Sequence, residues 1–227
     1  MPVINLADTP VREFNAALHA LPQETNETHW RVLNPGGRHA LAVGLDAPVT
    51  VEIEGHVGYY CAGMNKQATV VVEGNAGVGV AENMISGQVH VKGDVSQSAG
   101  ATGNGGLLIV EGNASARCGI SMKGIDIVVK GSIGPMSAFM AQAGNLVVLG
   151  DAGEALGDSI YEARLFVRGD VKSLGADCIE KPLTDEDCAV LVGLLEKAGV
   201  DASLDGFRLY GSARRLYHFH VDNVDAY

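Results

Sequence analysis

A pair of apolar positions that recurs every 19 residues is the most regular pattern along the chain. The two positions of a pair are separated by one residue, and most of them hold valine, isoleucine or leucine. The pairs are Val51 and Ile53, Val70 and Val72, Val89 and Val91, Leu108 and Val110, Ile127 and Val129, Leu146 and Val148, and Leu165 and Val167. Alternation with a period of two indicates the inward face of a β-strand, which suits β-branched side chains. The pattern therefore predicts one short strand in every 19 residues.

A glycine follows each predicted strand at the same period, without a single insertion. These glycines are Gly55, Gly74, Gly93, Gly112, Gly131, Gly150 and Gly169. A period held in this way is typical of a solenoid in which each unit forms one coil. The next residue is usually Asn, Asp or Ser, so we expect turns in which glycine supplies a positive φ and the polar side chain bonds to its local backbone.

These features predict an all-β protein, a right-handed parallel β-helix of about seven or eight coils. A coil of 19 residues does not fit the 18-residue coil of a left-handed hexapeptide helix, which favours the right-handed form. Stacked at about 4.8 Å, the coils would form a prism on the order of 35 Å long. The residue before each glycine faces water, and in the run Glu73, Lys92, Glu111 and Lys130 the charge alternates. We therefore expect weak ion pairs between neighbouring coils.

Both ends of a β-helix need covering, because a terminal strand presents unpaired backbone groups. Thr9 as N-cap, with Pro10 at the first helical position, predicts the start of a short amphipathic helix near residues 10–20. Thr184 opens a capping sequence for a second helix that ends at Gly199. The resulting division is an N-terminal cap over 1–29, the β-helix over 30–182, and a C-terminal helix with an extended tail over 183–227.

Composition restricts the partners and the location. The formal net charge of −11 argues against nucleic acid and anionic membranes as partners. No apolar run is long enough for a membrane helix, and the first residues lack a signal-peptide pattern. We therefore expect a cytoplasmic protein.

The sequence offers no convincing catalytic or metal site. Gly77-Val78-Gly79 resembles a phosphate loop, but a strand follows it where a dinucleotide fingerprint needs a helix. Cys61 and Cys118 share one phase three coils apart, about 14 Å, which is too far for a disulfide or a shared metal ion. We therefore expect no catalytic, cofactor-binding or metal-binding residue in this chain.

Two coil segments and the tail are the candidates for an interface with a partner. Both segments carry aromatic or methionine side chains where other coils have glycine, serine or charge, and the tail is aromatic and basic. The alternative is that the segments fill the interior of their own coils and the tail covers the end of the β-helix. The candidate interface residues are Tyr59, Tyr60, Met64, Met136, Phe139, Met140, Arg214, Arg215, Tyr217 and Phe219.

The glycine repeat, the segment Gly55–Met64 and the closing segment Ser173–Cys178 resemble the C-terminal β-helix domain of glutamate synthase large subunits, the GXGXG-motif family. The resemblance covers residues 30 to 182, and the chain looks most like the stand-alone β-helix subunits of N-methylglutamate synthases. It implies a non-catalytic subunit of a hetero-oligomer that converts methylamine and glutamate to N-methylglutamate and ammonia.

The resemblance also implies the partners. They are an amidotransferase-like subunit and a glutamate-synthase-like barrel subunit, and FMN and an iron–sulfur cluster are expected in a partner, with no cofactor in this chain. Two alternatives stay open. One is the β-helix subunit of a formylmethanofuran dehydrogenase or formyltransferase/hydrolase complex, and the other is an independent β-helix enzyme that acts on carbohydrate.

Overall fold

The structure is a computed structural model that describes residues 1–22, 24–26, 28–201 and 203–214. It contains one sheet and two helices. The strands are β1 (Val3–Asn5), β2 (His29–Leu33), β3 (Thr50–Glu54), β4 (Thr69–Val72), β5 (Gln88–Val91), β6 (Leu107–Val110), β7 (Lys123–Val129), β8 (Ala143–Val148), β9 (Arg164–Val167), β10 (Cys178–Lys181) and β11 (Arg208–Ser212). The helices are α1 (Val11–His19) and α2 (Asp185–Lys197).

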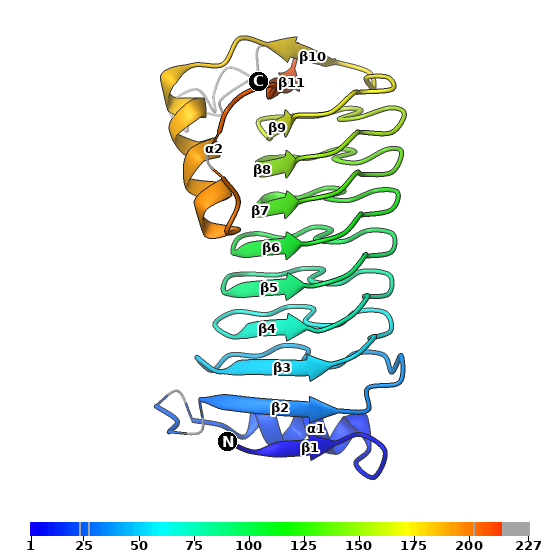
Figure 1. Ribbon diagram of the computed structural model, residues 1–227, viewed down its shortest axis with the longest axis vertical. Coiled ribbons are helices and arrows are strands. Elements are labelled where there is room, and N and C mark those ends of the chain that lie inside the picture. The colour runs from blue at the N-terminus through cyan, green and yellow to red at the C-terminus, as the bar shows by residue number, and fades with distance from the viewer. Residues whose placement is uncertain (23, 27, 202, 215–227) are drawn as a thin grey trace, which may run out of the picture.

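The strands stack into a parallel β-helix of about 7 turns, which confirms the predicted fold class. Figure 1 shows β1 to β9 as parallel rungs that follow one another from the N-terminal end upward. Residues 19 positions apart pair across neighbouring rungs, as Val70 does with Val89 and Val89 with Leu108. A second column of parallel bridges runs from Val57 to Val171. The inward positions of the strands are fully buried, so the core is a continuous column along the axis.

The recurrent glycines are required for a different reason from the one predicted. Of the seven, only Gly55 has a positive φ, of 132°. The others are needed because successive corners stack too closely for a side chain. A Cβ at Gly112 would lie 2.3 Å from Asp94 Oδ1 and 2.9 Å from the carbonyl carbon of Gly93. Steric exclusion by the preceding coil, and not a left-handed backbone, therefore fixes glycine at these corners.

The polar residue after six of the seven glycines accepts a hydrogen bond from the next coil, and the predicted local bond is wrong. The backbone N–H of Asn113 donates to Asp94 Oδ1 at 2.7 Å, and that of Ser132 donates to Asn113 Oδ1 at 2.9 Å. The same bond joins His56 to Asn75, Asn75 to Asp94, Ser132 to Asp151, and Asp151 to Asp170. Because each turn repeats directly above the previous one, a side-chain acceptor meets the equivalent donor one coil later. The corners form a hydrogen-bonded ladder along the protein.

The side of the coil that follows this corner contains residues in the left-handed region. Tyr60, Ala62 and Met64 have φ values of 59°, 54° and 56°, and equivalent positions in other coils repeat them. The N–H groups of Tyr60 and Met64 donate to the following coil, at 2.8 and 2.9 Å, whereas that of Ala62 donates to the preceding coil at 2.9 Å. Residues with a left-handed backbone thus occupy every second position of this segment, and its N–H groups bond to the coils on both sides.

The predicted column of alternating charge is present in part. Lys130 Nζ lies 2.7 Å from Glu111 Oε2, as expected. Glu73 and Lys92 form no ion pair within the described ranges. His90 instead approaches Glu111, with 2.6 Å between Nε2 and Oε1. The Glu111 carboxylate therefore contacts both Lys130 of its own column and His90 of the neighbouring column.

Helix α1 covers the N-terminal end of the β-helix, as predicted, and buries Phe14 and Leu18. Its N-cap is Pro10 and no side chain caps it, so the prediction of Thr9 as N-cap is wrong. The Asn15 side chain makes hydrogen bonds that a preceding coil would otherwise make. Its Nδ2 donates to the Ala40 carbonyl at 2.7 Å, and its Oδ1 accepts from the Ala42 N–H at 3.0 Å. The helix therefore satisfies backbone groups that another rung would otherwise bond.

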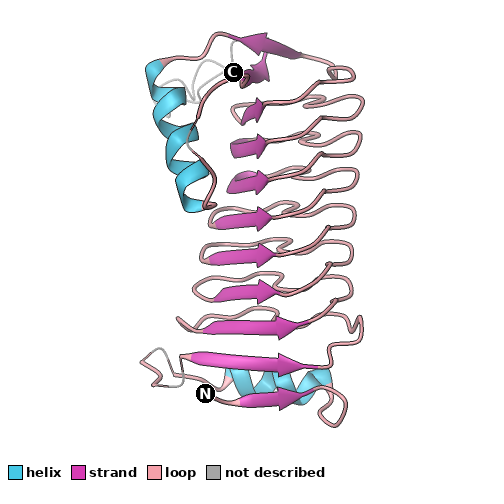
Figure 2. Cartoon of the chain, viewed as in Figure 1, coloured by secondary structure: helices cyan, strands magenta, loops and turns pink. Residues whose placement is uncertain are grey.

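Helix α2 lies along the flank of the β-helix and not over its end (Figure 2). Leu191, Leu194 and Leu195 pack against the outer face of the sheet, where they form a second apolar cluster. The outward-facing residue three positions before each glycine changes in character along the β-helix, which explains why α2 packs on the later coils. It holds Glu52, Val71 and His90 in the first coils but Ile109, Val128, Val147 and Phe166 in the later ones. The last four side chains are buried, and helix α2 is what covers them.

The C-terminal end is closed by strand β11, which inserts between β9 and β10 and runs antiparallel to both. Phe207 and Leu209 point to the cluster under α2, whereas Tyr210 packs on the main core. The first part of the predicted tail is therefore a cover, and residues 215–227 lie outside the described residues.

The start of α2 is tied to the sheet by polar contacts. Thr184 and Asp187 form the predicted capping box. Asp187 also lies 3.3 Å from Arg164 Nη1, and Arg164 Nε donates to Asn145 Oδ1 at 2.9 Å. Burial raises the pKa of Asp187, but hydrogen bonds from Thr184 and the charge of Arg164 outweigh it, so the pKa lies below its usual value.

We expect Gly112→Ala to lower the free energy of unfolding by about 2 kcal/mol, because the added Cβ overlaps the preceding corner. Gly193→Ala is the matched control: nothing lies within 4 Å of that Cβ, and alanine should stabilise α2 by up to about 1 kcal/mol. Urea unfolding followed by circular dichroism measures both. Equal effects of the two substitutions would contradict the steric explanation.

We expect Asp187→Asn to lower the free energy of unfolding by about 1 kcal/mol at pH 7. Because the folded pKa is depressed, the carboxylate stabilises the protein above its unfolded pKa of about 3.9, and this contribution disappears as the pH falls through the folded value. The variant should therefore lose less stability than the wild type between about pH 5 and pH 2. Asp185→Asn, which removes a charge from the same helical turn, is the control. Identical pH profiles for the wild type and Asp187→Asn would contradict the assignment.

Candidate functional site

In the described residues the metal-ligating side chains do not gather into a cluster, and the buried cysteine thiols are protonated. The described residues contain no group of three or more His, Cys, Asp or Glu side chains that could hold a metal ion. All four cysteines are free, and Cys61 and Cys118 are fully buried, so burial raises the pKa of each thiol to about 12. Burial also raises the pKa of Cys178 to about 11, although Lys181 opposes the shift. These thiols are protonated at neutral pH and are poor nucleophiles and ligands.

The six candidate residues of the two coil segments all lie on one side of the β-helix. On this side, positions four, five, eight and nine after each glycine flank buried positions six and seven. We call these four positions, in the five coils from Gly55 to Gly131, the turn face. Its positions are occupied by Tyr59, Tyr60, Gly63 and Met64; Val78, Gly79, Glu82 and Asn83; Gln97, Ser98, Ala101 and Thr102; Ala116, Arg117, Ile120 and Ser121; and Pro135, Met136, Phe139 and Met140.

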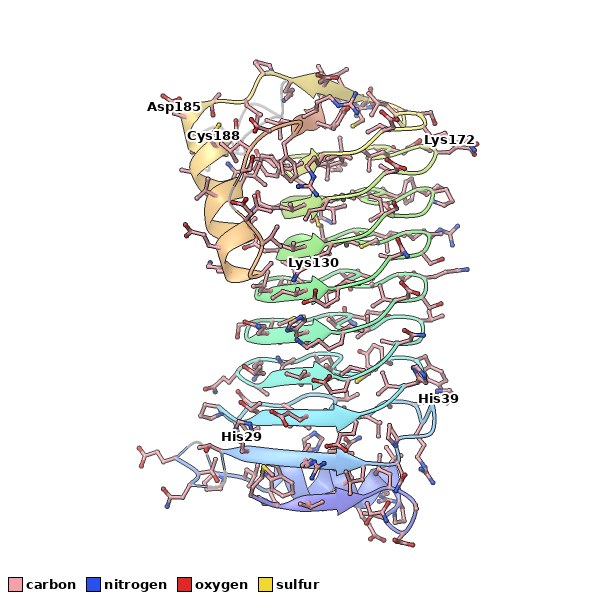
Figure 3. The ribbon with its side chains drawn as sticks, viewed as in Figure 1. His29, His39, Lys130, Lys172, Asp185 and Cys188 are labelled. Atoms are coloured by element: carbon pink, nitrogen blue, oxygen red, sulfur yellow. The ribbon has the colours of Figure 1, made fainter. Side chains whose placement is uncertain are left out.

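The first coil of the turn face presents two tyrosines and a methionine. Tyr59 is 54% exposed and stacks on His39, with 3.9 Å between ring centroids, at the edge marked by His39 in Figure 3. Tyr60 is half-buried, and its hydroxyl accepts a hydrogen bond from Asn83 Nδ2 at 3.2 Å. Met64 is 43% exposed and borders a hollow of about 360 Å³ beside α1. These side chains cover the outside of the coil, so they do not fill its interior.

The last coil of the turn face presents a second apolar group. Met140 is 42% exposed, and Met136 and Phe139 are half-buried. Met136 and Met140 have φ values of 55° and 52°, so they occupy the same left-handed positions as Tyr60 and Met64. The two apolar groups therefore share the same columns and lie four coils apart, about 19 Å.

The candidates from the tail have a different environment. Arg214 is exposed and forms an ion pair with Asp177, which ties it to the end of the β-helix. Arg215, Tyr217 and Phe219 lie outside the described residues. Six of the ten predicted interface residues thus lie on one side of the β-helix, in two groups about 19 Å apart.

A hollow of about 410 Å³ lies beside Arg164, Lys181 and Arg214 at the C-terminal end. Asp187 and Asp177 already pair with two of these cations. The contacts bind α2 and β11 to the sheet, which is a structural role.

The polar residues of the turn face are not among the candidates predicted from the sequence. Glu82 and Arg117 occupy its middle coils, and the signal that could have found them is their position within the 19-residue repeat, which matches that of Phe139 and of Tyr60 and Met136. Those three residues were noted for their bulk, whereas a single charge in a coil is unremarkable by itself.

No helix of the described residues is both long enough and apolar enough to cross a membrane. This finding agrees with the absence of long apolar runs in the sequence.

Comparison with known proteins finds a relative that matches the chain over its whole length. The chain is 65% identical over 228 residues to protein GlxC of Rhizobium meliloti (strain 1021), and the match covers 100% of both chains. No protein-family model matches the sequence, and no solved structure matches it significantly. On this identity over the full length, the chain belongs to the family of protein GlxC.

Proposed function

We propose that this chain is a non-catalytic structural subunit of a heteromeric, glutamate-synthase-like complex in the cytoplasm. The proposed complex is an N-methylglutamate synthase, a methylamine–glutamate N-methyltransferase. The observation that carries the proposal is the uninterrupted β-helix with 19-residue coils, whose segments Gly55–Met64 and Ser173–Cys178 resemble the β-helix domain of glutamate synthase large subunits. The relationship to protein GlxC agrees with a member of that group.

The architecture suits a subunit that positions others. Each rung bonds to the rungs before and after it through the strands, the bridges beginning at Val57 and the corner ladder. Bending such a body requires many hydrogen bonds to break together, so the β-helix is stiff along its axis. Stiffness is what the fixed placement of two active sites requires.

The reactive groups are assigned to partner subunits. An iron–sulfur cluster needs several cysteines around one point. In the described residues the cysteines are dispersed, and Cys61 and Cys118 lie three coils apart inside the core. These residues do not fit a cluster. We therefore assign the cluster and FMN to a glutamate-synthase-like barrel subunit, and glutamine or amine handling to an amidotransferase-like subunit.

The test is to purify the tagged full chain from its native host. We expect an amidotransferase-like chain and a flavin- and iron-containing chain to co-purify, with formation of N-methylglutamate from methylamine and glutamate. The isolated chain should bind no flavin and form no product, because its described residues hold no cluster of metal ligands and its buried thiols are protonated. Native mass spectrometry, with flavin and iron quantified per chain, measures the subunit composition and cofactor content of the complex.

Two results would contradict the proposal. One is purification of the chain without such partners, together with hydrolysis or lyase activity on an acidic polysaccharide. The other is co-purification with molybdopterin-containing and amidohydrolase-like chains, which would favour a formylmethanofuran-type complex.

A further inference from the structure

The hollow of about 410 Å³ at the C-terminal end is a gap in the outer face of the sheet, beside β10 and β11. Gly211 comes two residues after Leu209, so it faces the same outer side of β11 but presents no side chain there. A Cβ at Gly211 would lie 3.4 Å from Lys181 Cδ and 3.8 Å from the Ala163 carbonyl oxygen, which are ordinary contacts. The gap can therefore accept a side chain from another segment.

The lining of this hollow suits an apolar or aromatic side chain. Ala163, Pro182 and Leu209 contribute apolar surface, and Tyr161 on its rim is 48% exposed. A hollow of this size falls within the range of about 300–1,000 Å³ in which proteins hold small ligands. An aromatic ring placed here would cover apolar surface that water now reaches.

The charges around the hollow favour an occupant that carries an acid. Arg164 pairs with Asp187, and Arg214 pairs with Asp177. Lys181 is exposed and forms no ion pair within the described ranges. A carboxylate beside Lys181 would therefore meet a cation that the sheet leaves available.

The chain itself leaves the β-helix at the rim of this hollow. Arg214, the last described residue, lines the hollow. Two contacts hold it there: the Ala213 N–H donates to the Asp177 carbonyl at 2.7 Å, and the Arg214 side chain pairs with the Asp177 carboxylate. Residues 215–227 therefore begin beside the gap that Gly211 leaves.

The sequence of residues 215–227 provides both kinds of side chain. Tyr217 and Phe219 come three and five residues after Arg214, so they reach at most about 11 and 18 Å from it. They are two positions apart, so an extended chain presents both on one side. Two acids, Asp222 and Asp225, follow them.

From the exit point and the lining we propose that residues 215–227 fold back over this hollow. Tyr217 and Phe219 occupy it, and an acid of the same segment pairs with Lys181. The occupant is this chain's own tail, so these two aromatic residues cover the C-terminal end and do not bind a partner. The proposal does not rest on the function proposed above.

The covalent connection favours the tail over a separate protein. A segment tethered at the rim is present at an effective concentration in the millimolar range, because its linker is only a few residues long. Weak contacts are then sufficient to hold it. A free partner that used the same hollow would in addition lose its translational and rotational freedom.

The test is limited trypsin digestion of the purified full chain, with loss of the tail followed by mass spectrometry. Cleavage after Arg214 or Arg215 releases the tail, and its rate follows the fraction of molecules in which the tail is undocked. Each rate is divided by the rate for a synthetic peptide of the same tail sequence. This ratio removes differences in the intrinsic cleavage of each variant.

We expect Tyr217→Ser/Phe219→Ser to raise the normalised rate about tenfold, because the tail then lacks the side chains that fill the hollow. His218→Ser/His220→Ser is the matched control. These histidines alternate with the aromatic residues and lie on the other side of an extended chain, so this variant should stay within about twofold of the wild type.

A change in the hollow tests the other half of the contact with the tail sequence intact. Gly211→Leu fills the gap and should raise the normalised rate about tenfold, whereas Gly211→Ala should stay within about twofold. Circular dichroism checks that each variant is folded. Lys181→Glu, at an exposed position, should raise the rate about threefold and tests the hollow independently of Gly211.

A wild-type tail that is cleaved as fast as its synthetic peptide would overturn the proposal. Equal effects of the aromatic and histidine variants would also overturn it. So would a tail that resists trypsin only when other subunits are bound, which would identify it as an arm for a partner. Failure to find flavin-containing partners would contradict the proposed function and leave this result unaffected.

Discussion

The close stacking of successive corners is the constraint on which the rest of the structure depends. At Gly112 the backbone of one coil lies so near Gly93 and Asp94 that a single methyl group would overlap both. This proximity lets Asp94 accept the N–H of Asn113, and the same bond recurs along the ladder. The coils are therefore held in one register at the corner, and the other columns of side chains share that register.

Once the register is fixed, each outward column can vary without disturbing the fold. Three residues before the glycine, the column changes from Glu52 to the buried Phe166, and helix α2 covers its apolar part. On another side of the coil, Glu82 and Arg117 are the charged residues of the turn face. The same rigid body thus has one side covered by its own helix and exposed apolar side chains, such as Tyr59 and Met140, on the turn face.

Helix α1 and strand β11 close the two ends of the repeat by making hydrogen bonds that a further coil would otherwise make. Asn15 supplies the acceptor and donor that Ala42 and Ala40 would otherwise find on a preceding rung. At the other end β11 enters the sheet antiparallel, so the last regular rung, β9, has a partner on both sides. Together they limit the strand edges from which uncontrolled stacking of molecules would begin.

The sequence by itself determined the coil, because its signals are periodic and local: strand positions, corner glycines, inward columns and the capping box at Thr184 all follow from residue type and phase. It also placed Tyr60, Met64, Met136 and Met140 on shared columns. The tertiary structure alone decided what contacts what. The position of α2 depends on Phe166 and Leu195, the corner ladder on residues 19 positions apart, and the closing strand β11 on a chain that returns to β9. Such contacts join segments whose individual patterns are compatible with several neighbours, and packing in space selects one of them.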